Sequence, residues 1–107
     1  WGIILPFDVS KIEIQCSLRP GGACTDEDFT AALYTANRSN NDNTAITLTK
    51  VAHSQTLFKQ GKYVTNDFDY TADLNKGTMI YVGVGTEDSS PAAKNARGIM
   101  NITVTQR

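Results

Sequence analysis

The segment NDFDYTAD, residues 66–73, offers three carboxylates and a hydroxyl at a spacing that suggests metal chemistry. The oxygen-bearing side chains occupy alternate positions: Asp67, Asp69, Thr71 and Asp73. A calcium-binding loop presents its oxygens in this way, but it also needs glycine at its sixth position and a bidentate glutamate at its twelfth. Ala72 and Thr78 stand at those two positions, so the calcium-loop motif is incomplete.

The same alternation is typical of a β-strand whose intervening residues are apolar, here Phe68, Tyr70, Ala72 and Leu74. Alternate residues of an extended strand lie about 6.5–7 Å apart, which is too far for three carboxylates to surround one ion. We therefore interpret the aspartates as a solvated strand face that discourages edge-to-edge pairing. We expect no metal and no other cofactor. The alternative is a calcium site built from separate loops, with Asp26, Glu27, Asp28, Glu87 and Asp88 as ligands.

Nucleophilic catalysis would require a base beside a serine or cysteine, and His53 is the only histidine. No serine lies in a G-x-S-x-G turn, and Cys16 is in phase with apolar neighbours. We expect His53 at a strand end and no enzymatic activity. Cys16 and Cys24 are too few to form a four-ligand zinc site. They either form a disulfide across the intervening glycines, or Cys16 is a small core residue.

Length and composition limit the remaining classes of function. The 107 residues suit one domain, residues 1–107, with 40% hydrophobic and 20% charged residues. The net charge of −1, without a cluster of basic residues, argues against nucleic acid or an anionic membrane as partner. No apolar run approaches the ~20 residues needed to cross a bilayer, so we expect no membrane insertion.

The elements that must position any site are short strands. Residues 11–19 alternate strictly, with Ile12, Ile14, Cys16 and Leu18 on one face. Residues 3–9 are apolar at odd positions, so the phase reverses, which predicts a bulge or corner between Pro6 and Ser10. In residues 44–51 we expect Ile46 and Leu48 to point inward. Further strands are predicted in 63–74, 78–85 and 98–105, with turns about every ten residues. This pattern predicts an all-β fold, a jelly-roll-like antiparallel β-sandwich of about seven to eight strands.

One segment, residues 26–36, is ambiguous between helix and strand. Thr25 and Asp28 resemble a capping box, and apolar residues follow at helical spacing. The polar loop at 38–43, followed by a second β-like run, instead indicates a hairpin. We favour the strand.

Exposed aromatic rings and loop amides are the candidates for ligand binding. Tyr63 is out of phase with the apolar face of 64–74, and Trp1 is terminal, so both rings could stack on sugars. The polar loop adds groups that suit hydroxyl-rich ligands, namely Asn40, Asn41 and Asp42. The alternatives are that the tyrosines fill or rim the core and that the loop residues are ordinary turn formers.

Three stretches together resemble small jelly-roll or sandwich domains of bacteriophage virion proteins: ILPFDVSKIEIQ, DFTAALYTA, and DLNKGTMIYVGVG before RGIMNITVTQ. Such domains form tail-fibre tips and head-decoration proteins. The resemblance implies a homotrimer displayed on a virion, in contact with other virion proteins or with host-surface glycans. The alternative is a carbohydrate-binding module of a secreted enzyme.

A trimer would cover an apolar strip that a monomer exposes. We expect this strip in GIILPF, at Ile3, Ile4 and Leu5, because the segment is apolar on both faces. The alternative is that Gly2 to Phe7 forms a central strand covered on both faces within one domain.

Overall fold

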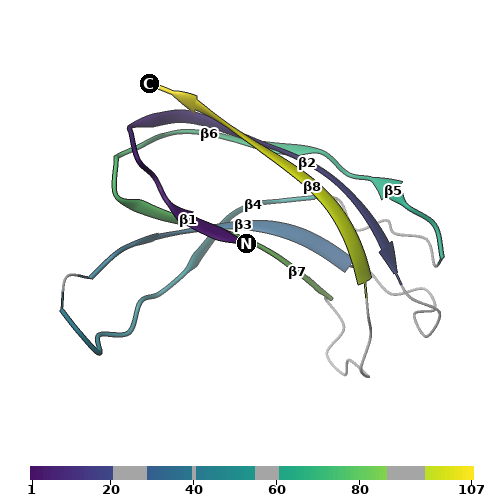
Figure 1. Cartoon of the computed structure of the whole chain (residues 1–107), viewed down its shortest axis with the longest axis horizontal. Helices are drawn as coiled ribbons and strands as arrows, with labels where there is room; N and C mark the ends of the chain where they lie inside the picture. Colours follow the sequence, from purple (N-terminus) through teal and green to yellow (C-terminus); the bar gives the residue numbers. More distant parts are fainter. Residues whose placement is uncertain (21–28, 40, 55–60, 87–95) are drawn as a thin grey trace.

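The computed structural model describes residues 1–20, 29–39, 41–54, 61–86 and 96–107. These residues form eight strands in two antiparallel sheets and contain no helix (Figure 1). Sheet A has the order β1 (Gly2–Ile4), β7 (Thr78–Thr86), β3 (Phe29–Asn37) and β4 (Thr49–His53). Sheet B contains β5 (Val64–Thr65), β2 (Val9–Pro20), β6 (Phe68–Leu74) and β8 (Ala96–Gln106). The predicted antiparallel β-sandwich of seven to eight strands is confirmed.

β2 is the central strand of sheet B because it pairs with every other strand of that sheet. It pairs with β8 from Val9 to Pro20, and also with β6 and then β5. Its pairing shifts register between Val9 and Lys11, where the sequence pattern predicts a bulge. The chain changes from sheet A to sheet B just before this point, which explains why the apolar phase reverses.

The core lies between the sheets and consists of the inward-facing residues of both. Ten buried hydrophobic residues form one cluster: Leu5, Val9, Ile12, Ile14, Cys16, Leu18, Ala31, Leu33, Ile80 and Val82. The predicted alternation in β2 is therefore confirmed. The alternation of β6 is confirmed too, with Phe68, Tyr70 and Leu74 half-buried and Asp69, Thr71 and Asp73 exposed.

The expectation that Ile46 and Leu48 point inward is wrong. Their side chains are 39% and 45% exposed, and β4 begins only at Thr49. The register gives the reason. Thr49 lies opposite Thr35, two residues before β3 ends at Asn37, so Ile46 extends past the end of β3, and Leu48 immediately precedes the first paired residue of β4.

The ambiguous segment is a strand where the structure describes it. Phe29–Asn37 pairs with β7 over its whole length, so the preference for a strand is confirmed for those residues. The remaining part, residues 26–28, lies outside the described residues.

Within the described chain, no helix is long and apolar enough to span a membrane.

Candidate functional site

The outer faces of the two sheets differ in chemical character. On sheet B the outward residues of β2 are polar, and Lys11 Nζ lies 3.3 Å from Glu13 Oε1 and 3.4 Å from Asp69 Oδ2. The outward positions of β8 from Asn101 onward are likewise polar, and Ile99, 67% exposed, is the large apolar exception. This face needs no cover, because its side chains interact well with water.

The outer face of sheet A is apolar along β1 and β7. Pairing places Ile4 opposite Met79 and Gly2 opposite Tyr81, while Ile80 and Val82 point into the core. Ile4 is 48% exposed and Tyr81 43%. An antiparallel sheet facing water normally alternates apolar inward and polar outward residues, so this face departs from the expected pattern.

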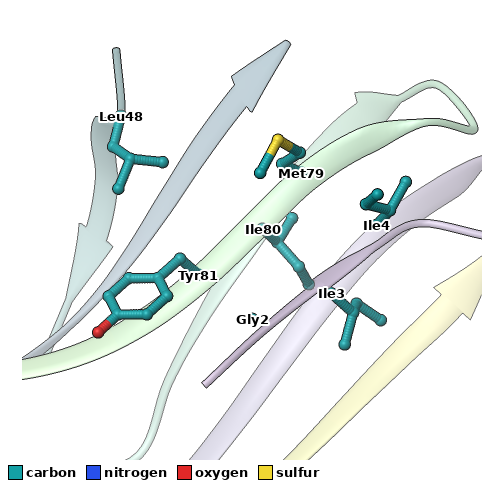
Figure 2. A pocket seen from close by; sticks show the side chains of 7 residues that line it. All are labelled: Gly2, Ile3, Ile4, Leu48, Met79, Ile80 and Tyr81. Carbon is teal, nitrogen blue, oxygen red and sulfur yellow. The ribbon is translucent and has the colours of Figure 1, made fainter. Parts of the chain in front are cut away.

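Side chains from three segments border an open groove of about 470 Å³ on this face (Figure 2). Its lining residues are Gly2, Ile3, Ile4, Leu48, Met79, Ile80 and Tyr81. Figure 2 shows Met79 and Tyr81 on β7, Ile4 on β1, and Leu48 across from Ile4 on the segment that precedes β4. No charged side chain is among these residues, so the groove suits an apolar partner surface.

Tyr81 is the central residue of this face because it contacts neighbours on two sides. Its ring centroid lies 6.2 Å from that of Tyr34, which is opposite it on β3. Its Cε1 lies 2.9 Å from the position that a Cβ on Gly83 would occupy. The ring is thus held close to the sheet by a glycine and by a second aromatic ring.

The three predicted interface residues occupy different environments. Ile3 is half-buried and packs against the core, Leu5 is 1% exposed and belongs to the core, and Ile4 alone faces outward. The alternative of a central strand is wrong, because β1 lies at the edge of sheet A with β7 as its one neighbour among the described strands. Sequence reasoning did not place Leu48, Met79 or Tyr81 in an interface. The run TMIYVGVG has apolar residues at both odd and even positions, and this was the available signal for Met79 and Tyr81.

The predicted sugar-binding residues do not come together. Trp1 pairs with Val82 at the edge of sheet A, whereas Tyr63 precedes β5 in sheet B and has Arg19 Cζ 6.0 Å from its ring centroid. Figure 1 shows the N-terminus, β5 and the connection between β3 and β4 in different parts of the molecule. Asn41 and Asp42 are exposed in that connection, and Asn40 lies outside the described residues.

The acidic run of the sequence is a strand face. Asp67, Asp69 and Asp73 are exposed; Asp67 Oδ1 accepts a hydrogen bond from the Cys16 backbone N–H, and Asp73 pairs with Arg107 at 3.5 Å. The described part of the chain contains no group of three or more acidic, histidine or cysteine side chains that could hold a metal ion. The alternative ligands at 26–28, 87 and 88 lie outside the described residues.

Cys16 is placed unfavourably for nucleophilic chemistry. Cys16 is a free, buried thiol whose S–H donates to the Asn66 carbonyl oxygen. Burial raises the pKa of this thiol, and the nearby Asp67 carboxylate raises it further, so the reactive thiolate is disfavoured. His53 lies at the end of β4, as expected, with Nδ1 2.8 Å from the Ser54 carbonyl oxygen. Cys24 lies outside the described residues.

Comparison with known proteins gives no relative: no protein-family model, no curated protein and no solved structure matches this chain. The case for a function therefore rests on the geometry described above and on the resemblance noted in the sequence.

Proposed function

We propose that this domain is a non-enzymatic structural domain of a bacteriophage virion that assembles as a homotrimer, in a tail-fibre tip or a capsid-decoration protein. The observation that carries the proposal is the apolar outer face of sheet A, formed by Ile4, Leu48, Met79 and Tyr81. The sequence resemblance to virion sandwich domains supports the virion location and the threefold assembly.

The size of the face is that of the apolar patches that proteins commonly expose and that are often functional. Ile4, Leu48 and Tyr81 are each nearly half exposed. With about 200 Å² per large side chain, they leave roughly 300 Å² of apolar surface. A standard interface covers ~800 Å² per subunit, with an apolar centre and a polar rim. The face therefore has the size of an interface centre, and polar neighbours would form the rim.

Further copies of the chain are suitable occupants, because apolar sheet faces that meet around a symmetry axis remove one another from water. In a trimer each copy would contribute the apolar face of sheet A to a contact near the threefold axis. The polar outer face of sheet B would then remain toward water, in keeping with its ion pairs.

The first test is the solution mass of the protein by light scattering after gel filtration. We expect three times the chain mass of 11.7 kDa. Ile4→Lys should yield folded monomers, because the new charge would be buried in the interface but can reach water in the single chain. Ile99→Lys is the matched control, since Ile99 is exposed on the opposite sheet, and it should remain trimeric.

Three results would overturn the proposal. They are a monomeric parent protein, an Ile4→Lys variant that stays assembled, and dissociation by Ile99→Lys to the same extent. If Ile4→Lys failed to fold, Leu48→Lys would test the same face from a segment outside the strands. A monomer whose Trp1 fluorescence responds to polysaccharides would instead favour a carbohydrate-binding module of a secreted enzyme.

A further inference from the structure

The inner face of sheet A changes from apolar to polar toward one end of the sandwich. On β3 the inward positions run from Leu33, which belongs to the core, to Thr35 and Asn37. The neighbouring strands share the change, because Thr49 of β4 lies opposite Thr35 and Thr78 of β7 lies opposite Asn37. The inner faces of a sandwich normally form its apolar core, so polar inner residues on three adjacent strands depart from the expected pattern.

These residues line an open hollow of about 330 Å³ at this end of the molecule. Figure 1 shows the turn between β6 and β7 and the connection between β3 and β4 at the same end of the sandwich, and both contribute to the wall. We call this site the polar hollow, after its six neutral polar side chains: Thr35, Asn37, Thr47, Thr49, Asn75 and Thr78. It shares no lining residue with the apolar groove on the outer face of sheet A, so the two sites are distinct.

The polar hollow carries little net charge. Among the described residues that line it, Asp73 is the one charged side chain, and Arg107 Nη1 lies 3.5 Å from Asp73 Oδ2. Arg107 Nη2 also donates to Asn75 Oδ1 at 3.1 Å, which holds the guanidinium beside the hollow. Because the carboxylate already has a cation beside it, the site favours a neutral ligand over a metal ion or an anion.

The polar side chains of the hollow can both donate and accept hydrogen bonds. A threonine hydroxyl has one donor and two acceptor sites, and an asparagine amide offers both kinds of group. Within the described chain, no side-chain hydrogen bond engages Thr35, Thr49 or Thr78. Sugar hydroxyls have the same dual character, whereas a lipid or an apolar side chain would leave these groups without partners, at a cost in free energy. Leu74, which is half-buried, also lines the hollow and offers apolar surface to the C–H groups of a ring.

We propose that the polar hollow binds one neutral sugar unit. The ring hydroxyls exchange hydrogen bonds with Thr35, Asn37 and Thr49, and the Asp73 carboxylate accepts one more. The volume lies near the lower limit of ligand pockets, which is about 300 Å³, so it suits a single ring rather than a long chain. None of the sugar-binding residues predicted from the sequence lines this site. The inference does not depend on the trimer proposed above.

NMR spectra of the threonine methyl groups test the proposal, because threonines lie both in the hollow and far from it. The probes are the methyl glycosides of D-glucose, D-galactose, D-mannose and N-acetyl-D-glucosamine, each added up to about 20 mM, well above the ~1 mM of weak binding. At least one glycoside should give saturable shifts at the four threonines of the hollow: Thr35, Thr47, Thr49 and Thr78. The internal controls are exposed threonines of sheet B, which should not shift: Thr71, Thr103 and Thr105.

Matched variants separate a specific site from weak general contact. Thr49→Val keeps the branched shape but removes the hydroxyl, and it should weaken binding about three- to tenfold, as expected for one lost hydrogen bond. Thr103→Val removes a hydroxyl from the exposed face of sheet B and should leave the affinity unchanged. Thr47→Trp should abolish binding by filling the hollow, and Thr47 is exposed and precedes β4, so the fold should tolerate the change.

Several outcomes would overturn the proposal: no saturable shift with any of the four glycosides, equal shifts at the control threonines, or the same shifts on addition of calcium chloride or sodium phosphate. Equal losses of affinity in Thr49→Val and Thr103→Val would also contradict it. The comparison of ligands needs no variant, so it decides the question even if a variant does not fold. A trimer that binds none of the glycosides would contradict this inference alone, and a monomer that binds one would contradict only the proposed assembly.

Discussion

Tyr34 and Tyr81 lie opposite each other on β3 and β7, with ring centroids 6.2 Å apart and ring planes inclined at 49°. The pair is on the outer face of sheet A, on the side away from the core. Cross-strand pairs of aromatic rings stabilise a sheet when they meet in such tilted arrangements. The Tyr34–Tyr81 pair is therefore a part of the apolar face that should stabilise the single chain as well as line a contact.

A double-mutant cycle on Tyr34 and Tyr81 should reveal this coupling. We expect the free-energy cost of the Tyr34→Ala, Tyr81→Ala double variant to differ from the sum of the single costs by about 0.5–1 kcal/mol. Urea denaturation in the Ile4→Lys background would measure it, so that all proteins share one assembly state. A cycle on Tyr34 and Tyr70, which lie in different sheets, is the control. Coupling energies of equal size in both cycles would contradict a specific stabilising contact between the Tyr34 and Tyr81 rings.

Gly98→Ala should destabilise the protein, although alanine usually suits a strand better than glycine does. A Cβ at this position would lie 2.7 Å from Leu18 Cδ2, and Leu18 is only 1% exposed. The added Cβ would displace the buried Leu18 side chain, and displacing a packed side chain costs about 1–3 kcal/mol. In a Leu18→Ala background the same substitution should cost less, because the space is vacated. Thermal or urea unfolding of the four proteins checks this, and a neutral Gly98→Ala would show that Leu18 moves aside freely.

Acid should weaken the structure in part through Asp8, which holds the turn between β6 and β7. The Lys76 backbone N–H donates to Asp8 Oδ1 at 2.8 Å, and Arg107 Nη2 lies 3.5 Å from Asp8 Oδ2. The bond from Lys76 and, less strongly, Arg107 lower the pKa of Asp8 below its usual 3.8. The unfolded chain therefore binds the proton more readily than the folded chain does.

The sign of this effect gives a testable pH dependence. The contribution of Asp8 is complete above about pH 4 and is lost as the pH falls through the lowered pKa. Asp8→Asn should show a smaller difference between its urea midpoints at pH 7 and pH 3 than the parent protein does. Carboxyl chemical shifts should titrate below 3.8 for Asp8 in the folded protein. A midpoint difference unchanged by Asp8→Asn would contradict this account.

The strand content and much of the burial pattern could be predicted from the sequence, because strand geometry is local. Side chains alternate in any extended chain, so the apolar face of 11–19 and of 64–74 is visible without knowledge of the partner strands. The bulge near Ser10 was predictable for the same reason, since an extra residue reverses the phase. The error at Ile46 and Leu48 shows the limit of this reasoning. Alternation indicates an extended run, but pairing decides where a strand starts.

The candidate site, like the fold, was only partly predictable from the sequence. From the sequence alone, this protein is determined to be a small all-β sandwich, with Ile4 in an apolar segment and the aspartates of 67–73 on a solvated face. The tertiary structure decided that Leu5 enters the core while Ile4 stays outside, and that Leu48 and Tyr81 border the same groove as Ile4. These features depend on which strands are neighbours and where a short strand ends, and such contacts join residues far apart in the chain.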